Sequence, residues 1–250
     1  MNLTACTRSK GRALAILGFH KIGEPPANGW QTWFYVPEST FVSYLGYLKQ
    51  GAWDVVDIAG FLRGLAVPDA LPERAALLTF DDGYRSFING ALPRLLEFGY
   101  PSVMFVPTDF IGAHNSFDAD DEPEEALCDW DDLRELERLG VSVQSHGVSH
   151  RALSTLDRPT QQDEVLRSKT VLEAGLGKPV EVFAYPYGDG GMGHGWRARR
   201  RELREALVRA GYRAACLYGG GPLQFPISDP YRLARLAIGP DTDLESELSR

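Results

Sequence analysis

Short apolar segments alternate with amphipathic ones along nearly the whole sequence, and this alternation constrains the fold more than any other feature. Seven apolar segments have the length of buried strands: 13–19, 75–80, 102–106, 141–145, 181–185, 213–217 and 234–238. Helical patterns lie between or after them, over 38–50, 84–98, 130–139, 159–174, 197–210 and 243–248. Strands that alternate with helices form parallel sheets. We therefore expect an α/β protein in which residues 1–250 form one domain, a closed or nearly closed β/α barrel of about seven strands.

Glycines mark several of the expected helix ends. Gly99, Gly140, Gly175 and Gly211 each lie at or near the end of a helical pattern, where a residue in the left-handed conformation commonly terminates a helix. Pro159 lies two residues after Asp157, a placement typical of a first helical turn.

The composition argues against several classes of function. The formal net charge of −8 argues against a nucleic-acid-binding surface. No run of about 18 apolar residues occurs, so no membrane span is expected, and the apolar run 13–19 is too short for a convincing signal peptide. The three cysteines, Cys6, Cys128 and Cys216, have no paired spacing and suit reduced thiols. We therefore expect a cytoplasmic protein, and the sequence does not predict its oligomeric state.

Chemically reactive side chains follow several of the expected strands directly. Asp81 and Asp82 come after the second strand, His20 after the first and His146 after the fourth, and Tyr185-Pro-Tyr-Gly188 ends the fifth. Carboxyl ends of parallel strands share one face of a barrel, so these groups are expected to converge. Two adjacent carboxylates repel each other unless they share a cation or a proton. The alternative for Asp-Asp-Gly alone is a turn that caps the next helix, but the convergence favours a site.

His146 and His150 are four residues apart. If the chain turns helically after Ser145, both imidazoles lie on one side of the turn. With a carboxylate as third ligand they would bind a divalent cation and leave positions open for water. The alternative is a buried, hydrogen-bonded His146 and a His150 that caps a helix. Two histidines at this spacing, in a sequence with only five, favour the metal site.

Two motifs together carry a resemblance to a known family. Thr79-Phe-Asp-Asp-Gly83 and Ser145-His-Gly-Val-Ser-His150 resemble the first two motifs of the polysaccharide deacetylases, the NodB-like carbohydrate esterase family 4. The resemblance implies a distorted (β/α)7 barrel, a divalent metal and the removal of an acetyl group from a carbohydrate, such as a polymer that contains N-acetylglucosamine. Zinc is the expected metal, with cobalt or nickel as alternatives.

The resemblance also implies roles for individual residues. Asp81 would be the catalytic base, and the metal ligands would be Asp82, His146 and His150. The backbone N–H of Tyr187 would stabilise the oxyanion, and Pro186 would fix the turn before it.

The sequence departs from the family pattern in three places, one of which is the absence of an Asp-Trp fourth motif after Tyr187. Ala184 stands where the third motif usually has an arginine that braces the base, and we expect Arg232 or Arg235 to replace it. The usual late histidine is missing, whereas His20 comes early, which resembles the circularly permuted branch typified by deacetylases of poly-N-acetylglucosamine. His20 is therefore the expected general acid, with two alternatives: a merely buried His20, or His194 as the acid.

Other classes of function stay open at this point. The missing arginine allows a barrel that binds a glycan without turnover, and the ligand set also suits a metal-dependent amidohydrolase of a small non-sugar amide. The aromatic-rich segment 21–35 would be a wall for sugar rings or ordinary packing. We expect the acidic segment 118–125 to be a solvated loop, and the glycine-rich segment 188–195 to be a mobile loop beside the site.

Overall fold

The computed structural model describes residues 11–26, 32–191 and 196–249. Its main sheet has six long or central parallel strands that neighbour one another in chain order. They are β1 (Ala13–Phe19), β5 (Arg74–Phe80), β6 (Ser102–Val106), β7 (Val141–Ser145), β8 (Val182–Ala184) and β9 (Ala214–Cys216). Of the five short strands, β4 (Asp54–Val55), β10 (Leu223–Gln224) and β11 (Leu236–Ala237) join this sheet, whereas β2 (Lys21–Ile22) and β3 (Tyr35–Val36) form a separate two-stranded sheet.

The C-terminal segment closes the sheet into a barrel. Leu233 pairs in parallel with Cys216 of β9, and β11 (Leu236–Ala237) pairs in parallel with β1. The segment from Leu233 to β11 therefore pairs with both edge strands, β9 and β1, and takes the place of a seventh strand of the barrel. This closure confirms the predicted distorted (β/α)7 barrel.

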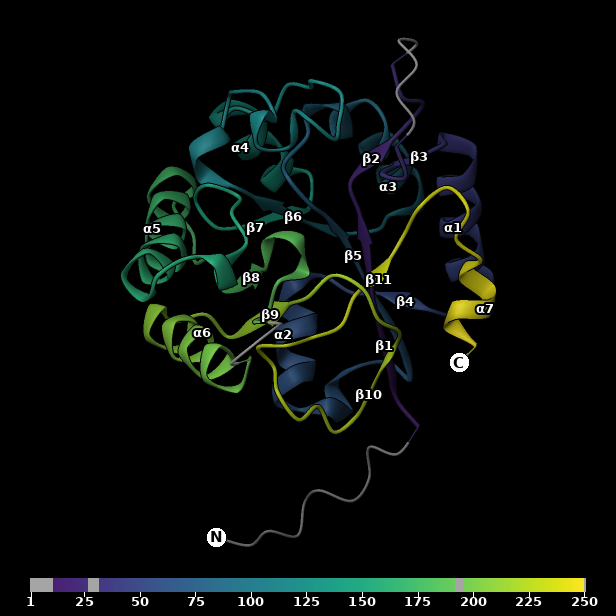
Figure 1. Ribbon diagram of the computed structural model, residues 1–250. Coiled ribbons are helices and arrows are strands. Elements are labelled where there is room, and N and C mark those ends of the chain that lie inside the picture. Colours follow the sequence, from purple (N-terminus) through teal and green to yellow (C-terminus); the bar gives the residue numbers. More distant parts are fainter. Residues whose placement is uncertain (1–10, 27–31, 192–195, 250) are drawn as a thin grey trace, which may run out of the picture.

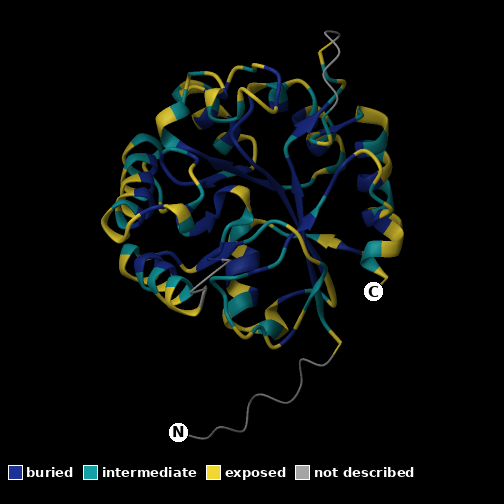
Figure 2. Cartoon of the chain, in the orientation of Figure 1, coloured by how far each residue is buried: buried dark blue, intermediate teal, exposed yellow. Residues whose placement is uncertain are grey.

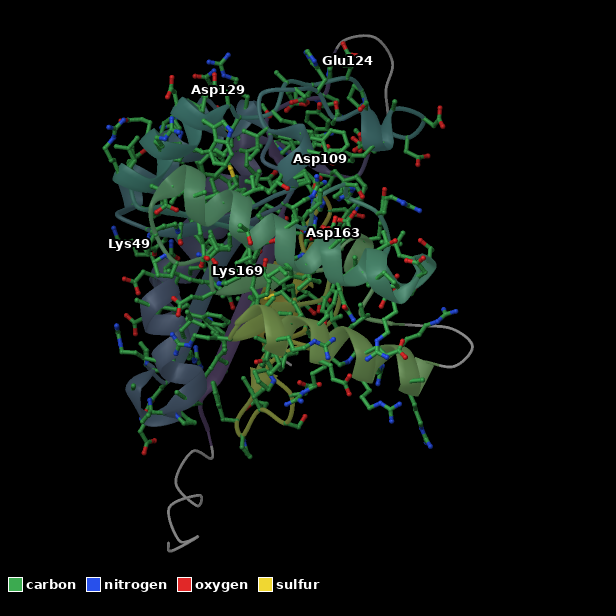
Figure 3. All side chains as sticks on the ribbon, turned by 90° about the vertical axis from the view of Figure 1, so that its left-hand side faces the viewer. Lys49, Asp109, Glu124, Asp129, Asp163 and Lys169 are labelled. Atoms are coloured by element: carbon green, nitrogen blue, oxygen red, sulfur yellow. The ribbon has the colours of Figure 1, made fainter. Side chains whose placement is uncertain are left out.

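Helices lie around the outside of the strands (Figure 1). They are α1 (Glu38–Gln50), α3 (Ala91–Phe98), α4 (Trp130–Arg138), α5 (Arg158–Leu176), α6 (Trp196–Ala210) and α7 (Leu244–Leu248). The strands are buried, whereas the outward helix faces are exposed (Figure 2). Charged side chains such as Asp163 and Lys169 lie on α5 (Figure 3), where Arg167 pairs with Asp109 at 3.0 Å. None of the helices in the described ranges is long and apolar enough to cross a bilayer.

Alternate residues of β1, β5 and β6 enter two different apolar cores, as the pleat of a strand requires. Ala15 and Leu17 of β1 belong to the core shared with the outer helices, whereas Leu14 and Ile16 belong to a second core inside the barrel. Phe61 and Leu62 of α2 (Ile58–Ala66) also belong to this second core. The sequence did not indicate α2, whose buried side chains contribute to this second core.

Two predicted helix boundaries are wrong. The helix expected over 84–98 is a 3₁₀ turn, Arg85–Ile88, followed by α3 from Ala91. Gly90 breaks it where the chain passes close to β2, since a Cβ there would lie 2.3 Å from the carbonyl oxygen of Ile22. Gly175 does not end α5; Gly177 does, with a left-handed φ of 68°. Gly175 instead makes room for the ring of Trp130.

Candidate active site at the carboxyl ends of the strands

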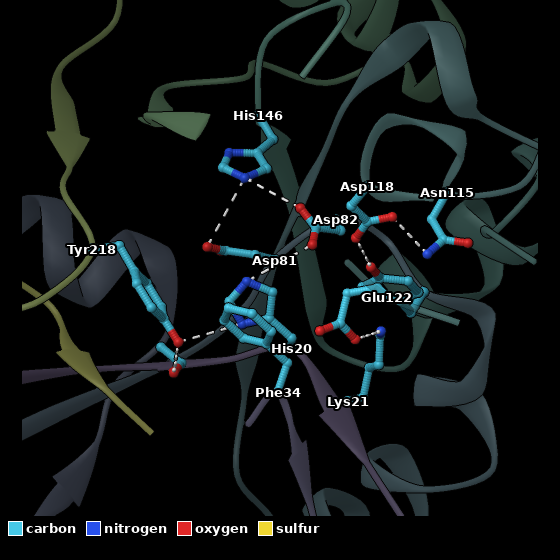
Figure 4. A network of polar contacts seen from close by, with 12 residues as sticks. His20, Lys21, Phe34, Asp81, Asp82, Asn115, Asp118, Glu122, His146 and Tyr218 are labelled. Carbon is cyan, nitrogen blue, oxygen red and sulfur yellow. Dashed lines mark hydrogen bonds and ion pairs between the residues drawn. The ribbon is translucent and has the colours of Figure 1, made fainter. Parts of the chain in front are cut away.

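The predicted site residues meet at one end of the barrel, and Figure 4 shows Asp81, Asp82, His20 and His146 among them. Asp81 and Asp82 follow β5, His146 and His150 follow β7, and His20 follows β1. All five line a cleft of about 530 Å³. The two aspartates and the two later histidines are buried, so their charges are shielded from bulk water.

Asp82, His146 and His150 form a compact cluster whose ligand atoms lie within 4.8 Å of one another. The Oδ1 atom of Asp82 is 3.3 Å from Nε2 of His146 and 3.1 Å from Nε2 of His150. The Nδ1 atom of His146 lies 2.8 Å from the carbonyl oxygen of Ala184, which accepts a hydrogen bond from it and leaves Nε2 free to face Asp82. Asp82 has a left-handed backbone with φ of 72°, an uncommon conformation for a residue with a side chain.

The segment that carries the two histidines is not helical, contrary to the sequence expectation. His150 has φ of 53°, and a buried carboxylate of α5 shapes the loop instead. Oε2 of Glu164 accepts the backbone N–H of Val148 at 2.7 Å and that of Ser149 at 3.0 Å. Glu164 thus shapes the loop so that the two imidazoles come together. The spacing of residues in the sequence does not predict these hydrogen bonds from Val148 and Ser149 to Glu164.

The cluster suits a divalent cation. Within the described part of the chain, Oδ1 of Asp82 is buried and has no hydrogen-bond donor, although two imidazole nitrogens approach it. Burial raises the pKa of Asp82, but the charges of His150 and the other nearby histidines outweigh it and hold that pKa well below the ordinary value. One carboxylate oxygen and two imidazole nitrogens are a ligand set typical of zinc and related metals. The residues therefore fit the predicted metal.

Arg235 holds Asp81. Its guanidinium, which is fully buried, makes two parallel contacts of 2.6 Å to the two carboxylate oxygens, and its Nε donates to the carbonyl of Leu217 at 2.6 Å. Burial raises the pKa of Asp81, but the adjacent guanidinium and His146 lower it below the ordinary value. Arg232, the other candidate from the sequence, instead donates to the carbonyl of Gly190 and does not contact Asp81. Arg235, which directly precedes β11, thus supplies the guanidinium that the usual motif arginine, replaced here by Ala184, would have provided.

His20 lies on the other side of Asp82. Its Nε2 is 3.8 Å from Oδ2 of Asp82, and the ring of Phe34 packs against it with centroids 4.5 Å apart. Burial lowers the pKa of His20, while the charges of Asp82 and Asp81 oppose this effect. The hydroxyl of Tyr218 lies 3.4 Å from Nδ1. No motif in the sequence singles out Tyr218, although its place directly after the strand predicted over 213–217 was a usable signal.

Tyr187 follows the buried Pro186 at the end of β8, and its ring lies 4.8 Å from that of His150. Its backbone φ is 57°, a strained value for a residue other than glycine. Its side chain is 61% exposed and lines the cleft. His194, the alternative acid, and residues 192–195 of the glycine-rich segment lie outside the described residues.

The walls of the cleft are aromatic on one side and acidic on another. Trp33 and Phe34, from the aromatic-rich segment, line it, as does Asp118. The acidic segment is not simply solvated, contrary to expectation: Glu122 is 5% exposed and pairs with the buried Lys21 at 2.7 Å. Lys21 lies next to His20 in the chain, so this ion pair ties the acidic segment to the end of β1.

A comparison with protein families decides the relationship. The family model described as polysaccharide deacetylase matches residues 69–215, which is more than half of the chain. This chain belongs to the polysaccharide deacetylase family. The match spans β5 to β9 and includes both motifs on which the sequence prediction depended, so that prediction is confirmed.

Individual relatives agree with the family. YxkH of Bacillus subtilis (strain 168) is 24% identical over 179 residues, 72% of this chain and 58% of YxkH. The poly-beta-1,6-N-acetyl-D-glucosamine N-deacetylase of Escherichia coli (strain K12) is 31% identical over 87 residues, 35% of this chain and 13% of that protein. This chain therefore spans less than two thirds of either relative. The deacetylase PplD of Streptococcus pyogenes, solved in complex with acetate, has the same fold, with a TM-score of 0.77 at 21% identity over 92% of this chain and 93% of PplD.

Proposed function

We propose that this chain is a metal-dependent hydrolase that removes the N-acetyl group from N-acetylglucosamine units of a carbohydrate and releases acetate. The observation that carries the proposal is the pairing of Asp81, held by Arg235, with the adjacent cluster of Asp82 and two histidines in one cleft. The deacetylase family and the named substrate of the Escherichia coli relative support the substrate class.

Asp82, His146 and His150 would hold the divalent metal, and zinc is the expected ion for one oxygen and two nitrogen ligands. When bound, the ion supplies Lewis acidity, which lowers the pKa of a water molecule and polarises the acetyl carbonyl. Because the two histidines turn their Nε2 atoms toward Oδ1 of Asp82, Asp82 would be committed to the ion. Its neighbour Asp81 is then the carboxylate left to move protons.

Asp81 would act as the general base. It accepts one proton from the attacking water while the water oxygen bonds to the acetyl carbon. The two contacts from Arg235 fix the plane of this carboxylate, and its lowered pKa keeps it ionised at neutral pH. The oxyanion that forms on the acetyl group would accept the backbone N–H of Tyr187.

His20 would act as the general acid from the opposite side of Asp82. When the carbon–nitrogen bond breaks, the sugar nitrogen takes a proton from His20 and leaves as an amine. The products are acetate and a free amino sugar. Aromatic side chains such as Trp33 and Phe34 offer flat surfaces on which a sugar ring packs.

The alternative of a barrel that binds without turnover depended on the missing arginine at Ala184. Arg235 supplies a guanidinium at the base from another strand, so this reason for the alternative disappears.

Acetate release from a panel of substrates tests the proposal. The panel contains short N-acetylglucosamine oligomers with β-1,6 or β-1,4 linkage, the monosaccharide, an O-acetylated sugar and a simple aliphatic acetamide. We expect release from the oligomers, with the aliphatic acetamide as a poor substrate. Faster turnover of the aliphatic acetamide than of every sugar would favour the amidohydrolase alternative and contradict the proposal.

A further inference from the structure

Tyr218 lies two residues after the end of β9, and its side chain reaches across to the end of β1 (Figure 4). Its hydroxyl is 3.4 Å from Nδ1 of His20 and 3.5 Å from the carbonyl oxygen of Gly18. The two rings meet edge to face, with centroids 5.2 Å apart and an interplanar angle of 86°. The phenol therefore touches the side of the imidazole that faces away from Asp82.

Two glycines from different strand ends leave space for Tyr218. A Cβ on Gly18 would lie 3.0 Å from Cε2 of the Tyr218 ring, and a Cβ on Gly188 would lie 2.7 Å from the backbone nitrogen of Tyr218. The guanidinium of Arg235 lies 5.3 Å from the centre of the same ring. Tyr218 is thus confined by β1, by the turn after β8 and by the arginine that holds Asp81.

His20 depends on this phenol for its orientation. Phe34 packs against the ring, and Nε2 faces Asp82 at 3.8 Å. Across the residues that the structure describes, the hydrogen-bond partner of Nδ1 is the hydroxyl of Tyr218, and no carboxylate pairs with that nitrogen. A histidine that transfers protons usually has its second nitrogen fixed by a carboxylate or a backbone carbonyl, so this arrangement is unusual.

A hydroxyl group suits this place because it both donates and accepts. The imidazolium carries a proton on Nδ1, and the neutral ring keeps that proton after Nε2 has given up its own. In both states the oxygen of Tyr218 can accept a hydrogen bond from Nδ1 and donate its own hydrogen to the carbonyl of Gly18. The imidazole thus keeps one orientation, with Nε2 toward the cleft, before and after it gives up a proton.

We propose that Tyr218 is the positioning residue of His20: its hydroxyl holds Nδ1, so that Nε2 faces the nitrogen of the departing amine. This inference rests on the proposed function, in which His20 is the general acid. It assigns Tyr218 no contact with substrate and no part in metal binding.

The variant Tyr218→Phe tests the inference because it keeps the ring and removes only the hydroxyl. One hydrogen bond of ordinary strength corresponds to a fall of about 10-fold in kcat for an N-acetylglucosamine oligomer. KM, metal content and Tm should stay close to the parent values. Hydrolysis of 4-nitrophenyl acetate, whose leaving group needs no proton, should be unchanged. Tyr44→Phe is the matched control, since it removes a phenol that bonds the carbonyl of Thr242 away from the cleft.

A double-mutant comparison separates this inference from the proposed function. His20→Ala should slow the oligomer far more than the activated ester, and adding Tyr218→Phe to it should cause no further loss. If His20→Ala is selective but Tyr218→Phe slows both substrates equally, or neither, the role of Tyr218 is overturned and the general acid stands. If His20→Ala slows both substrates equally at full metal content, the general acid and the inference fail together.

Discussion

At the scale of single residues, the two adjacent aspartates have opposite surroundings. Asp81 faces a buried guanidinium that binds both of its oxygens, whereas Asp82 faces two imidazoles through an oxygen that no described donor satisfies. Neighbouring residues of an extended segment point to opposite sides, and the left-handed backbone of Asp82 completes the separation. The proposed division between a base and a metal ligand follows from these surroundings.

Asp81→Asn should abolish most acetate release while metal content stays at the parent level. The amide has nearly the size of the carboxylate but cannot take a proton, and removal of a general base costs roughly 10²–10⁴-fold in kcat. Acetate assays and elemental analysis of the same preparation measure both quantities. An unchanged kcat would reduce Asp81 to a turn residue.

Arg235→Lys should keep a positive charge but lose the two parallel contacts to Asp81. Loss of charge-assisted hydrogen bonds predicts a fall of about 10-fold to 100-fold in kcat/KM. Because Arg235 lowers the pKa of Asp81, which must be ionised to act, the acidic limb of the pH profile should move to higher pH. Arg232→Lys, which does not contact Asp81, is the control and should leave that limb in place. An acidic limb at the same pH in both variants would contradict the role of Arg235 in holding Asp81.

At the scale of elements, the loop after β7 places the two histidines of the cluster, and a carboxylate on α5 shapes that loop. Glu164 accepts two backbone N–H groups of residues 148 and 149 and also the hydroxyl of Ser149. The sequence motif predicted the two histidines, but their convergence was expected from a helical turn after Ser145. The error is physical: tertiary hydrogen bonds to a helix distant in sequence override local spacing.

Glu164→Gln should weaken metal binding by roughly 10-fold to 100-fold, as is typical for groups that orient metal ligands. The amide offers one acceptor oxygen where the carboxylate offers two. Metal affinity is measured by competition with a chromophoric chelator. Glu173→Gln is the matched control, because Glu173 also lies on α5 and accepts a backbone N–H, that of Val180, away from the cleft. Equal losses in both variants would indicate a general effect on α5.

Sequence patterns predicted the main strands of the barrel and most of the outer helices, but they missed α2 and the short strands β2, β3, β4 and β10. The predicted bounds are correct for β1, β6, β7 and α1. The apolar pattern of each of these elements is continuous in the sequence. α2 was missed because it contains two glycines, which disfavour the interior of a helix. One of them, Gly64, is needed there because a Cβ would lie 2.1 Å from the side chain of Leu71.

At the scale of the whole molecule, the barrel brings together groups that lie more than 200 residues apart. His20 follows the first strand and Arg235 precedes the last, yet both contact the aspartates after β5 because β11 pairs with β1, which pairs with β5. The motifs predicted the aspartates and the two later histidines. The choice of Arg235 over Arg232 depended on the path of the closing segment, which the sequence does not reveal. That residues 1–250 form a single domain stays a prediction.

The most direct test of the central claim is acetate release as a function of metal content. Protein stripped by a chelator should release no acetate from N-acetylglucosamine oligomers, and activity should rise with added zinc until about one ion is bound per chain. The double variant His146→Ala, His150→Ala should neither bind that ion nor regain activity. Full acetate release by the stripped protein, or one tightly bound ion in the double variant, would contradict the account.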